Sequence, residues 1–282
     1  RDRLRSRGLG DVYKRQGNVL SVMLIAAAMG LGLAFMPKTE NREALLKTVL
    51  GFQELLFTLI KALLFVLPLG ILAFAGQLSA QIEAGVIVGA LGKYTLVIMA
   101  SNCVQFFIVL PIFLLARGLN PIDVFKKMSP AVAVALFTKS SAGTLPVTMA
   151  SAEQNLKVNK AVSRFVLPIC TTINMNGCAA FILITSIFVM QNAGFELSMS
   201  TMLTWLLVSV LAAVGNAGVP MGCYFLTLSL MSGIGAPIGI MGIILPIYTI
   251  IDMVETAENV WSDSCVCAMT DHDLKGKIAE EE

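Results

Sequence analysis

The sequence predicts an all-α, multi-span membrane protein with two re-entrant helical hairpins and one broken membrane-spanning helix. Hydrophobic residues make up 56% of its 282 residues and charged residues 13%, and the mean hydropathy of +0.81 lies outside the usual range of soluble domains. Glu196 is the only charged residue between Arg164 and Asp252. Short apolar segments joined by breaker-rich tips occur twice, at corresponding places in the two halves. Such a chain must be covered largely by lipid.

The first 16 residues differ in charge from the rest of the chain. They contain six basic and two acidic residues, and without them the formal net charge changes from +2 to −2. The segment lacks the apolar core of a signal peptide. We expect residues 1–16 to be a non-native or disordered lead and exclude them from the fold; a native basic cytoplasmic lead is the alternative. The remaining charges form no basic patch typical of a nucleic-acid partner.

The cysteines lie among apolar and small residues, without the paired spacing of zinc ligands. We expect them to be small helix-packing residues rather than a disulfide framework. They are Cys103, Cys170, Cys178, Cys223, Cys265 and Cys267.

Three apolar segments are predicted to be helices in the first part of the chain. Residues 19–36 carry no charge and, at about 1.5 Å per residue, are just long enough to cross a bilayer core of about 30 Å. This segment ends at Pro37. Residues 43–76 are predicted to form a longer, partly amphipathic helix, and residues 85–116 another span that only Lys93 interrupts, near its start.

The first predicted hairpin covers about residues 122–155. Its first apolar segment is too short to span a bilayer, and the tip KSSAGTLP, residues 139–146, and a second short helix follow it. Irregular backbone at membrane depth is tolerated only where protein or a water-filled cavity satisfies its N–H and C=O groups. The next span, residues 161–190, contains the polar sequence TTINMNG at 171–177. We expect this interruption to bind a ligand.

The same arrangement recurs in the second half of the chain. The second predicted hairpin covers about residues 200–235, with the tip GNAGVP at 215–220. The final helix, residues 236–269, acquires carboxylates in its second half, and a polar tail, residues 271–282, follows. Interrupted segments in corresponding positions predict inverted repeats and a secondary transporter whose site lies at the bilayer midplane.

One face of the final helix is predicted to carry a polar stripe. At about 100° per residue, Glu258 points away from this stripe, and Glu255 lies at its edge. Burying an unpaired carboxylate is costly, so an acid within the membrane is a functional candidate. The alternative is that this end of the helix emerges into water, which the polar tail makes possible. The stripe consists of Asp252, Thr256, Asn259 and Asp263.

The chemistry of these segments points to an amino acid and a cation as ligands. Oxygen-rich clusters without thiolates suit hard cations, and a carboxylate also pairs with an ammonium group. Asn174 in the broken span supplies another oxygen, and the helix N-termini near Ser140, Ser141 and Gly218 offer free N–H groups to a carboxylate. An intramembrane hydrolase is disfavoured because the sole histidine, His272, lies in the polar tail.

Four segments resemble, in order and spacing, the dicarboxylate/amino acid:cation symporters, the family that includes the glutamate transporters and their neutral amino-acid relatives. Residues 139–146 resemble the serine-rich first tip, and residues 174–178 resemble the Asn-Met-Asp-Gly-Thr signature. Residues 217–220 resemble the second tip, and residues 252–263 resemble the substrate-binding helix. The resemblance covers residues 17–270.

The resemblance implies how the chain is organised. It implies that the family's first three spans and part of its fourth are missing before residue 17, so that the chain is truncated. Residues 17–83 would be part of the trimerisation scaffold of a homotrimer, and residues 84–270 would be most of the moving transport domain. The bilayer would be the inner membrane of a bacterial cell.

The resemblance also implies the ligands of the site. Asp252 would hold the amine of the substrate, and the two tips would cradle its carboxylate. The implied substrate-binding residues are Ser140, Ser141, Cys178, Val219, Asp252, Glu255, Thr256 and Asn259. The implied sodium ligands are Asn174, Asn259 and Asp263 with carbonyls near Cys170 at one site, and Thr172 with tip carbonyls from Val214 to Asn216 at another.

Departures from the family pattern narrow the range of expected substrates. Glu255 stands where members with acidic substrates have an arginine, and Cys178 stands where the signature has its final threonine. Since a buried carboxylate repels a substrate carboxylate, glutamate, aspartate and C4 dicarboxylates are disfavoured. Glu255 with the following threonine resembles the serine/threonine branch. The alternative is that Lys139 neutralises Glu255, which then never meets substrate. Asn176 removes a cation-binding charge from the signature.

These features together predict a cation-coupled symporter of a small neutral amino acid such as serine or threonine, working by alternating access with Na⁺ and without an organic cofactor. We do not expect an enzyme. The alternatives are a sodium- or proton-coupled symporter of dicarboxylates or acidic amino acids, a passive channel, and a membrane fragment that does not transport.

Overall fold

The structure, a computed structural model, describes residues 19–52, 54–55, 58, 88–216 and 218–275. The lead at residues 1–16, the second half of the helix expected at residues 43–76 and the end of the tail lie outside these residues. The chain divides into two compact units, residues 1–86 and 87–282. This division lies close to the boundary predicted between residues 83 and 84, and the roles assigned to the two parts stay predictions.

The described part of the first unit is helical. Helix α2, Val19–Phe35, matches the first predicted span, and residues 40–52 form a further helical stretch. The backbone leaves the helix at Met36, next to Pro37, and the Nε atom of Arg42 donates a hydrogen bond to the carbonyl of Leu33 across this turn at 3.1 Å.

The second unit begins with one long helical stretch. It consists of α4 (Val88–Val104), a π-helical turn η1 (Gln105–Val109) and α5 (Leu110–Ala116). Three stretches of the described chain are long and apolar enough to cross a membrane: Leu91–Ala116, Lys160–Asn192 and Gly239–Leu274. All elements of the described residues are helices, which confirms the predicted class of a multi-span helical membrane protein.

The first helix pair, α6 (Pro121–Thr138) and α7 (Ser141–Ser151), forms where the first hairpin is predicted. The side chain of Asn120 caps α6, and Lys139 ends that helix in the left-handed region with φ of 52°. The Ser140 hydroxyl then caps α7 by accepting from the N–H of Gly143 at 3.0 Å. A π-helical turn, η2 (Ala152–Leu156), completes the pair. Re-entry of this pair into the membrane stays a prediction.

The broken span has the predicted interruption. Helix α8 (Lys160–Ile173) ends where the N–H of Asn174 donates to the carbonyl of Cys170, and α9 (Asn176–Asn192) begins two residues later. Residues 174–175 are not helical, so they leave polar groups in the middle of a stretch long enough to cross a bilayer.

The second helix pair consists of α10 (Met199–Gly215) and α11 (Gly222–Gly233), and both helices pack on α9. Ser198 caps α10 by accepting from the N–H of Thr201. No side chain caps α11, whose N-cap Met221 has φ of 61°.

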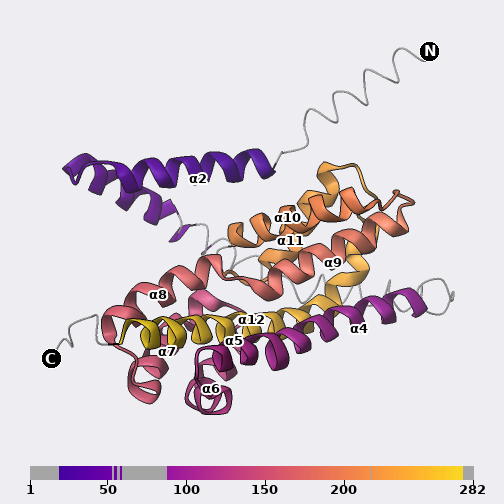
Figure 1. Cartoon of the computed structure of the whole chain (residues 1–282). Coiled ribbons are helices and arrows are strands. Elements are labelled where there is room, and N and C mark those ends of the chain that lie inside the picture. Colours follow the sequence, from indigo (N-terminus) through magenta and orange to yellow (C-terminus); the bar gives the residue numbers. More distant parts are fainter. Residues whose placement is uncertain (1–18, 53, 56–57, 59–87, 217, 276–282) are drawn as a thin grey trace, which may run out of the picture. The chain divides into compact units, whose positions relative to one another are not determined.

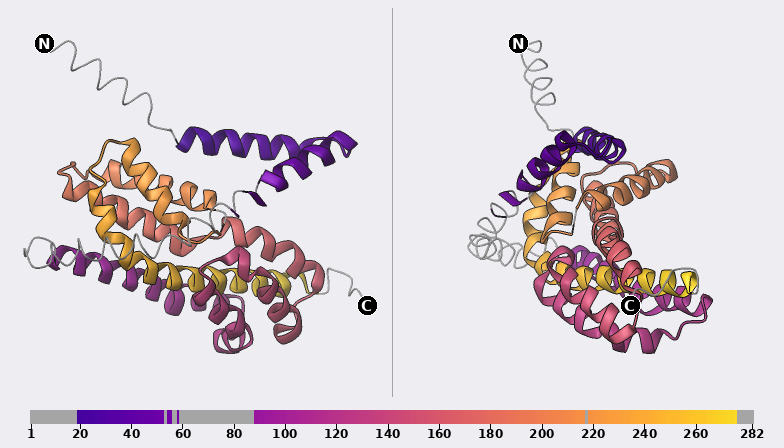
Figure 2. Two further views of the ribbon diagram at one scale, coloured as in Figure 1. Left: turned by 180° about the vertical axis from the view of Figure 1, so that it is seen from behind. Right: turned by 90° about the vertical axis from the view of Figure 1, so that its left-hand side faces the viewer.

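Helix α12, Gly239–Leu274, is the central element of the second unit (Figure 1). It packs against α4, α6, α8 and α9, and Figure 2 shows α4 and α12 running side by side. It starts three residues later and ends five residues later than predicted. Asp271 extends it, because its carboxylate accepts from the N–H of Asn159 at the start of α8 and so ties the helix end to the protein.

The prediction that the cysteines form no disulfide is wrong for one pair. Cys178 in α9 and Cys223 in α11 form a disulfide with their Cα atoms 5.6 Å apart. They lie 45 residues apart in the chain, and only the packing of α11 on α9 brings them together. The other cysteines are free; Cys103 is exposed, and Cys170, Cys265 and Cys267 are buried.

Candidate functional site

Helix α12 buries four carboxylates. Asp252 is 4% exposed, Glu255 1%, Glu258 0% and Asp263 1%. The alternative that this part of the helix emerges into water therefore does not hold, even for Glu258. In the described residues, no lysine, arginine or histidine lies within 4.0 Å of any of the four. Burying carboxylates without an ion-pair partner is costly, so these acids favour the binding of cations at this site.

Asp252 faces the tip of the second helix pair, where α11 begins. Its Oδ2 atom accepts from the N–H of Met221 at 3.3 Å, and its Oδ1 atom accepts from the hydroxyl of Tyr248 at 3.3 Å. The same hydroxyl lies 3.3 Å from Oε2 of Glu255, so Tyr248 bridges the two acids. The hydroxyl of Thr256 donates to the carbonyl of Asp252 at 2.7 Å, so this hydrogen bond stays within α12.

The broken span meets the second half of the polar stripe. The Nδ2 group of Asn174 donates to Oδ1 of Asp263 and to Oγ of Ser262, each at 2.9 Å. Asn176 donates to the same serine at 2.7 Å. The N–H of Gly177 donates to Oδ1 of Asn259 at 2.9 Å. The structure thus brings Asn174, Asn259 and Asp263, the predicted ligands of one sodium ion, to one side of α12.

The two tips touch each other. The hydroxyl of Ser140 donates to the carbonyl of Gly218 at 3.0 Å, and the N–H of Ala142 donates to it at 3.4 Å. Gly218 has φ of +66°, and a Cβ there would lie 2.8 Å from the carbonyl oxygen of Thr171 in the broken span. A residue with a side chain would therefore be strained at this position. The two tips and the broken span therefore meet around Gly218.

Several predicted site residues take no part in the hydrogen bonds that join α12 to the broken span. Thr172 is exposed and its hydroxyl donates to the carbonyl of Ile169. Val214 is 41% exposed, and the carbonyl of Asn216 accepts from the N–H of Val219. No hydrogen bond among the described residues joins Thr172 to these tip residues. The second predicted sodium site, Thr172 with tip carbonyls from Val214 to Asn216, stays a prediction.

The remaining predicted residues have structural partners. Ser141 is buried at the first turn of α7, and Val219 is half-buried. The carbonyl of Cys170 accepts from Asn174. Cys178, one of the predicted substrate-binding residues, is part of the disulfide, and its sulfur accepts from the side-chain amide of Asn216 at 3.2 Å.

Sequence reasoning missed Tyr248, Met221 and Ser262 as partners of the polar groups. Tyr248 lies four residues before Asp252, so helical spacing could have placed it on the same face. Met221 contributes a backbone N–H, which carries no signal in the sequence.

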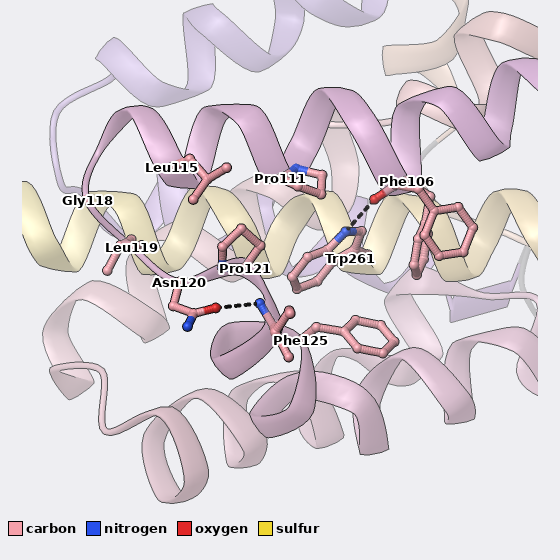
Figure 3. Close-up of a pocket in the computed structure, with 11 residues that line it drawn as sticks. Phe106, Pro111, Leu115, Gly118, Leu119, Asn120, Pro121, Phe125 and Trp261 are labelled. Atoms are coloured by element: carbon pink, nitrogen blue, oxygen red, sulfur yellow. Dashed lines mark hydrogen bonds between the residues drawn. The ribbon is translucent and has the colours of Figure 1, made fainter.

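An apolar cavity of about 680 Å³ lies elsewhere on α12 (Figure 3). Trp261, nine residues after Asp252 and so about 180° away around the helix, faces it, and its indole N–H donates to the carbonyl of Phe106 at 3.2 Å. Its walls include Phe107, Leu115 and Phe125, and no charged residue lines it. Without a charged group it cannot hold the ammonium and carboxylate of an amino acid.

The chain belongs to the Sodium:dicarboxylate symporter family, which its residues 12–273 match. It is 31% identical over 251 residues to excitatory amino acid transporter 1 of Ambystoma tigrinum, covering 88% of this chain and 46% of that protein. It is 31% identical to the human excitatory amino acid transporter 1, covering 91% and 48%, and 30% identical to the mouse excitatory amino acid transporter 2, covering 95% and 47%.

The chain spans about half the length of these relatives. The family consists of symporters, so the expectation that this is not an enzyme is confirmed, as is the family resemblance itself. The chain is part of an integral membrane protein.

Proposed function

We propose that the protein containing this chain is a sodium-coupled symporter of a small neutral amino acid such as serine or threonine. The observation that carries the substrate assignment is the environment of Glu255. It is 1% exposed, it shares the hydroxyl of Tyr248 with Asp252, and its Oε1 atom has no hydrogen-bond partner among the described residues. Lys139 is not within ion-pair distance of it. An acidic substrate would add a further negative charge beside two carboxylates that have no ion-pair partner within 4.0 Å among the described residues.

The site residues act in this proposal as donors and acceptors for a zwitterion. Asp252 binds the ammonium group, with Thr256 and Asn259 beside it on the same face. The N–H groups of the two tips, near Ser140, Ser141 and Val219, bind the carboxylate. Asn174, Asn259 and Asp263, whose oxygens suit a hard cation, bind one sodium ion.

Access to the site depends on the second helix pair. The tips bond directly to each other through Ser140 and Gly218, so a ligand between them must replace that contact. Opening and closing of the second pair therefore exposes and covers the site in an alternating-access cycle. In the whole protein, residues 17–83 belong to the scaffold of a homotrimer, residues 84–270 form most of the moving domain, and the bilayer is a bacterial inner membrane.

A second candidate is a symporter of acidic amino acids, which the names of the excitatory amino acid transporters favour. Uptake by the whole protein in proteoliposomes distinguishes the two. The panel is labelled serine, threonine, alanine, aspartate and cystine, with sodium or potassium outside. We expect concentrative, sodium-dependent uptake of serine or threonine, which a channel cannot perform.

The substitution Glu255→Arg tests the charge argument. It is expected to convert uptake of serine into uptake of aspartate, whereas Glu196→Arg, the same charge change at an exposed position, leaves substrate preference unchanged. A wild-type protein that prefers aspartate contradicts the proposed substrate.

A further inference from the structure

Glu258 is the buried acid that the proposed transport site does not use. Its side chain is 0% exposed, and neither carboxylate oxygen has a hydrogen-bond partner among the described residues. The other three acids each accept at least one hydrogen bond, from Met221, Tyr248 or Asn174. A fully buried carboxylate without any donor is strongly destabilised unless something else compensates its charge.

A second unpartnered acceptor faces Glu258 from another helix. Asn102 in α4 is 2% exposed; its Nδ2 group donates to the carbonyl of Ile98 at 3.0 Å, and its Oδ1 atom has no partner among the described residues. Because the amide nitrogen is held by Ile98, the oxygen stays turned away from that bond. The π-helical turn η1 begins three residues later.

Gly177 allows both of these side chains to approach α9 closely. A Cβ on Gly177 would lie 2.6 Å from Oε2 of Glu258 and 3.1 Å from Oδ1 of Asn102, so both oxygens lie against the same glycine. The Cα atom of Glu255 lies 3.0 Å from that point and closes another side. The N–H of Gly177 donates to Oδ1 of Asn259 at 2.9 Å and also lies near the carboxylate of Glu258. Among the described residues, neither the Glu258 oxygens nor Oδ1 of Asn102 has a hydrogen-bond partner of normal geometry.

We propose that Glu258 and Asn102 bind a sodium ion beside Gly177, at a position separate from the one formed by Asn174 and Asp263. Carboxylate and amide oxygens are hard ligands, which suit sodium rather than a soft metal. A monovalent ion balances the single charge of Glu258 and fills the place of the missing donor. The inference rests on the proposed sodium-coupled function and adds one ion to its cycle.

The test uses the whole protein in proteoliposomes, with two readouts: the sodium concentration at half-maximal serine uptake, and the ratio of ²²Na⁺ to serine transported. Glu258→Gln and Asn102→Leu each remove a ligand oxygen or its charge, and Gly177→Ala fills the space. We expect the half-maximal sodium concentration to rise about tenfold, which corresponds to about 1.4 kcal/mol, and the ratio to fall by one ion.

Ser264→Ala is the matched control. Ser264 is buried in the same helix, but its hydroxyl donates to the carbonyl of Val260, so its loss leaves both readouts unchanged. The three variants lie on three different elements, so a folding defect in one does not decide the test. Size-exclusion profiles identify the variants that fold.

Unchanged sodium dependence and an unchanged ion ratio in the folded variants overturn the inference. So does a shift in the pH dependence of uptake with no change in the sodium readouts, because Glu258 then carries a proton. A wild-type protein without sodium-dependent uptake refutes the proposed function itself, which separates the two failures.

Discussion

The two helix pairs have similar order in the sequence but are held in the structure by different contacts. The first pair, α6 and α7, is broken over two residues, and its helices pack on each other and on α12. The Ser140 hydroxyl caps α7. The second pair, α10 and α11, is broken over six residues, packs on α9 and has no side-chain cap on α11.

This difference indicates which pair is able to move. The end of the first pair is also held to α8 by an ion pair, in which Nε of Arg164 lies 3.2 Å from Oε1 of Glu153. Near its tip, the second pair is attached to its surroundings by the disulfide and by hydrogen bonds of the Asn216 amide, the Gly218 carbonyl and the N–H of Met221. Apart from the disulfide, only hydrogen bonds hold the tip, so we expect the second pair to act as the gate of the proposed cycle, with the disulfide as a restraint on its opening.

The largest expected effect comes from replacing Asp252, whose carboxylate accepts a hydrogen bond from the N–H of Met221. Asp252→Asn removes the charge that binds the substrate ammonium and weakens the attachment of the second pair. We expect serine uptake to fall by about 100-fold or more, as for truncation of a buried charge pair. Initial uptake rates measure this, with Glu196→Gln as an exposed control. A rate within about twofold of wild type would refute the role of Asp252.

Substitutions of two serines that cap helices, Ser140 and Ser198, test the contact between the tips. Ser140→Ala removes the cap of α7 and the bond to Gly218, and is expected to cost about 2 kcal/mol of unfolding free energy. Ser198→Ala removes the cap of α10 and an exposed hydrogen bond with the Thr201 hydroxyl, but no contact between the tips, and is expected to cost about 1 kcal/mol. Denaturant unfolding of the purified protein compares them. Equal losses contradict a contribution from the tip contact.

The disulfide allows the mobility of the second pair to be tested directly. The bond between Cys178 and Cys223 joins α11 to α9, so it restrains opening. If opening limits the rate, a membrane-permeant reductant is expected to raise uptake by roughly threefold to tenfold. Cys223→Ser, which lacks the bond, serves as the control and does not respond to reductant. An equal response in this variant contradicts the explanation.

The smallest expected effect concerns the ion pair between Glu153 and Arg164, which holds the end of the first helix pair to α8. Burial raises the pKa of Glu153, but hydrogen bonds from Ser163 and Arg164 outweigh it and leave the pKa below its ordinary value. A lowered pKa stabilises the fold at pH values above the unfolded pKa, and this stabilisation is lost as the pH falls through the folded pKa. Arg164 is largely exposed, so the contribution is less than about 1 kcal/mol.

Unfolding measured between neutral and acidic pH checks this expectation. Glu153→Gln is expected to remove a small part of the acid destabilisation, and Glu196→Gln, at an exposed residue, is expected to have no such effect. A larger acid effect in Glu153→Gln than in wild type contradicts the assigned sign.

Helix positions were predictable because the signals are local. The tip at Ser140, the interruption at Asn174 and the breakers around Gly218 each stand out from apolar neighbours, and the structure breaks its helices at these places. The end of α12 was missed because Asp271 bonds to Asn159, a contact between distant parts of the chain. The stripe through Asp252 and Asp263 followed from helical spacing alone.

The sequence by itself determined that the protein is a helical membrane protein, where its helices break and which face of α12 carries acids, because hydropathy and periodicity act within one segment. Only the tertiary structure decided that Cys178 and Cys223 are bonded, that Ser140 meets Gly218, and that Glu258 and Asn102 both lie against Gly177. Those facts depend on how separate helices pack, and neither spacing nor composition encodes the distance between side chains on different helices.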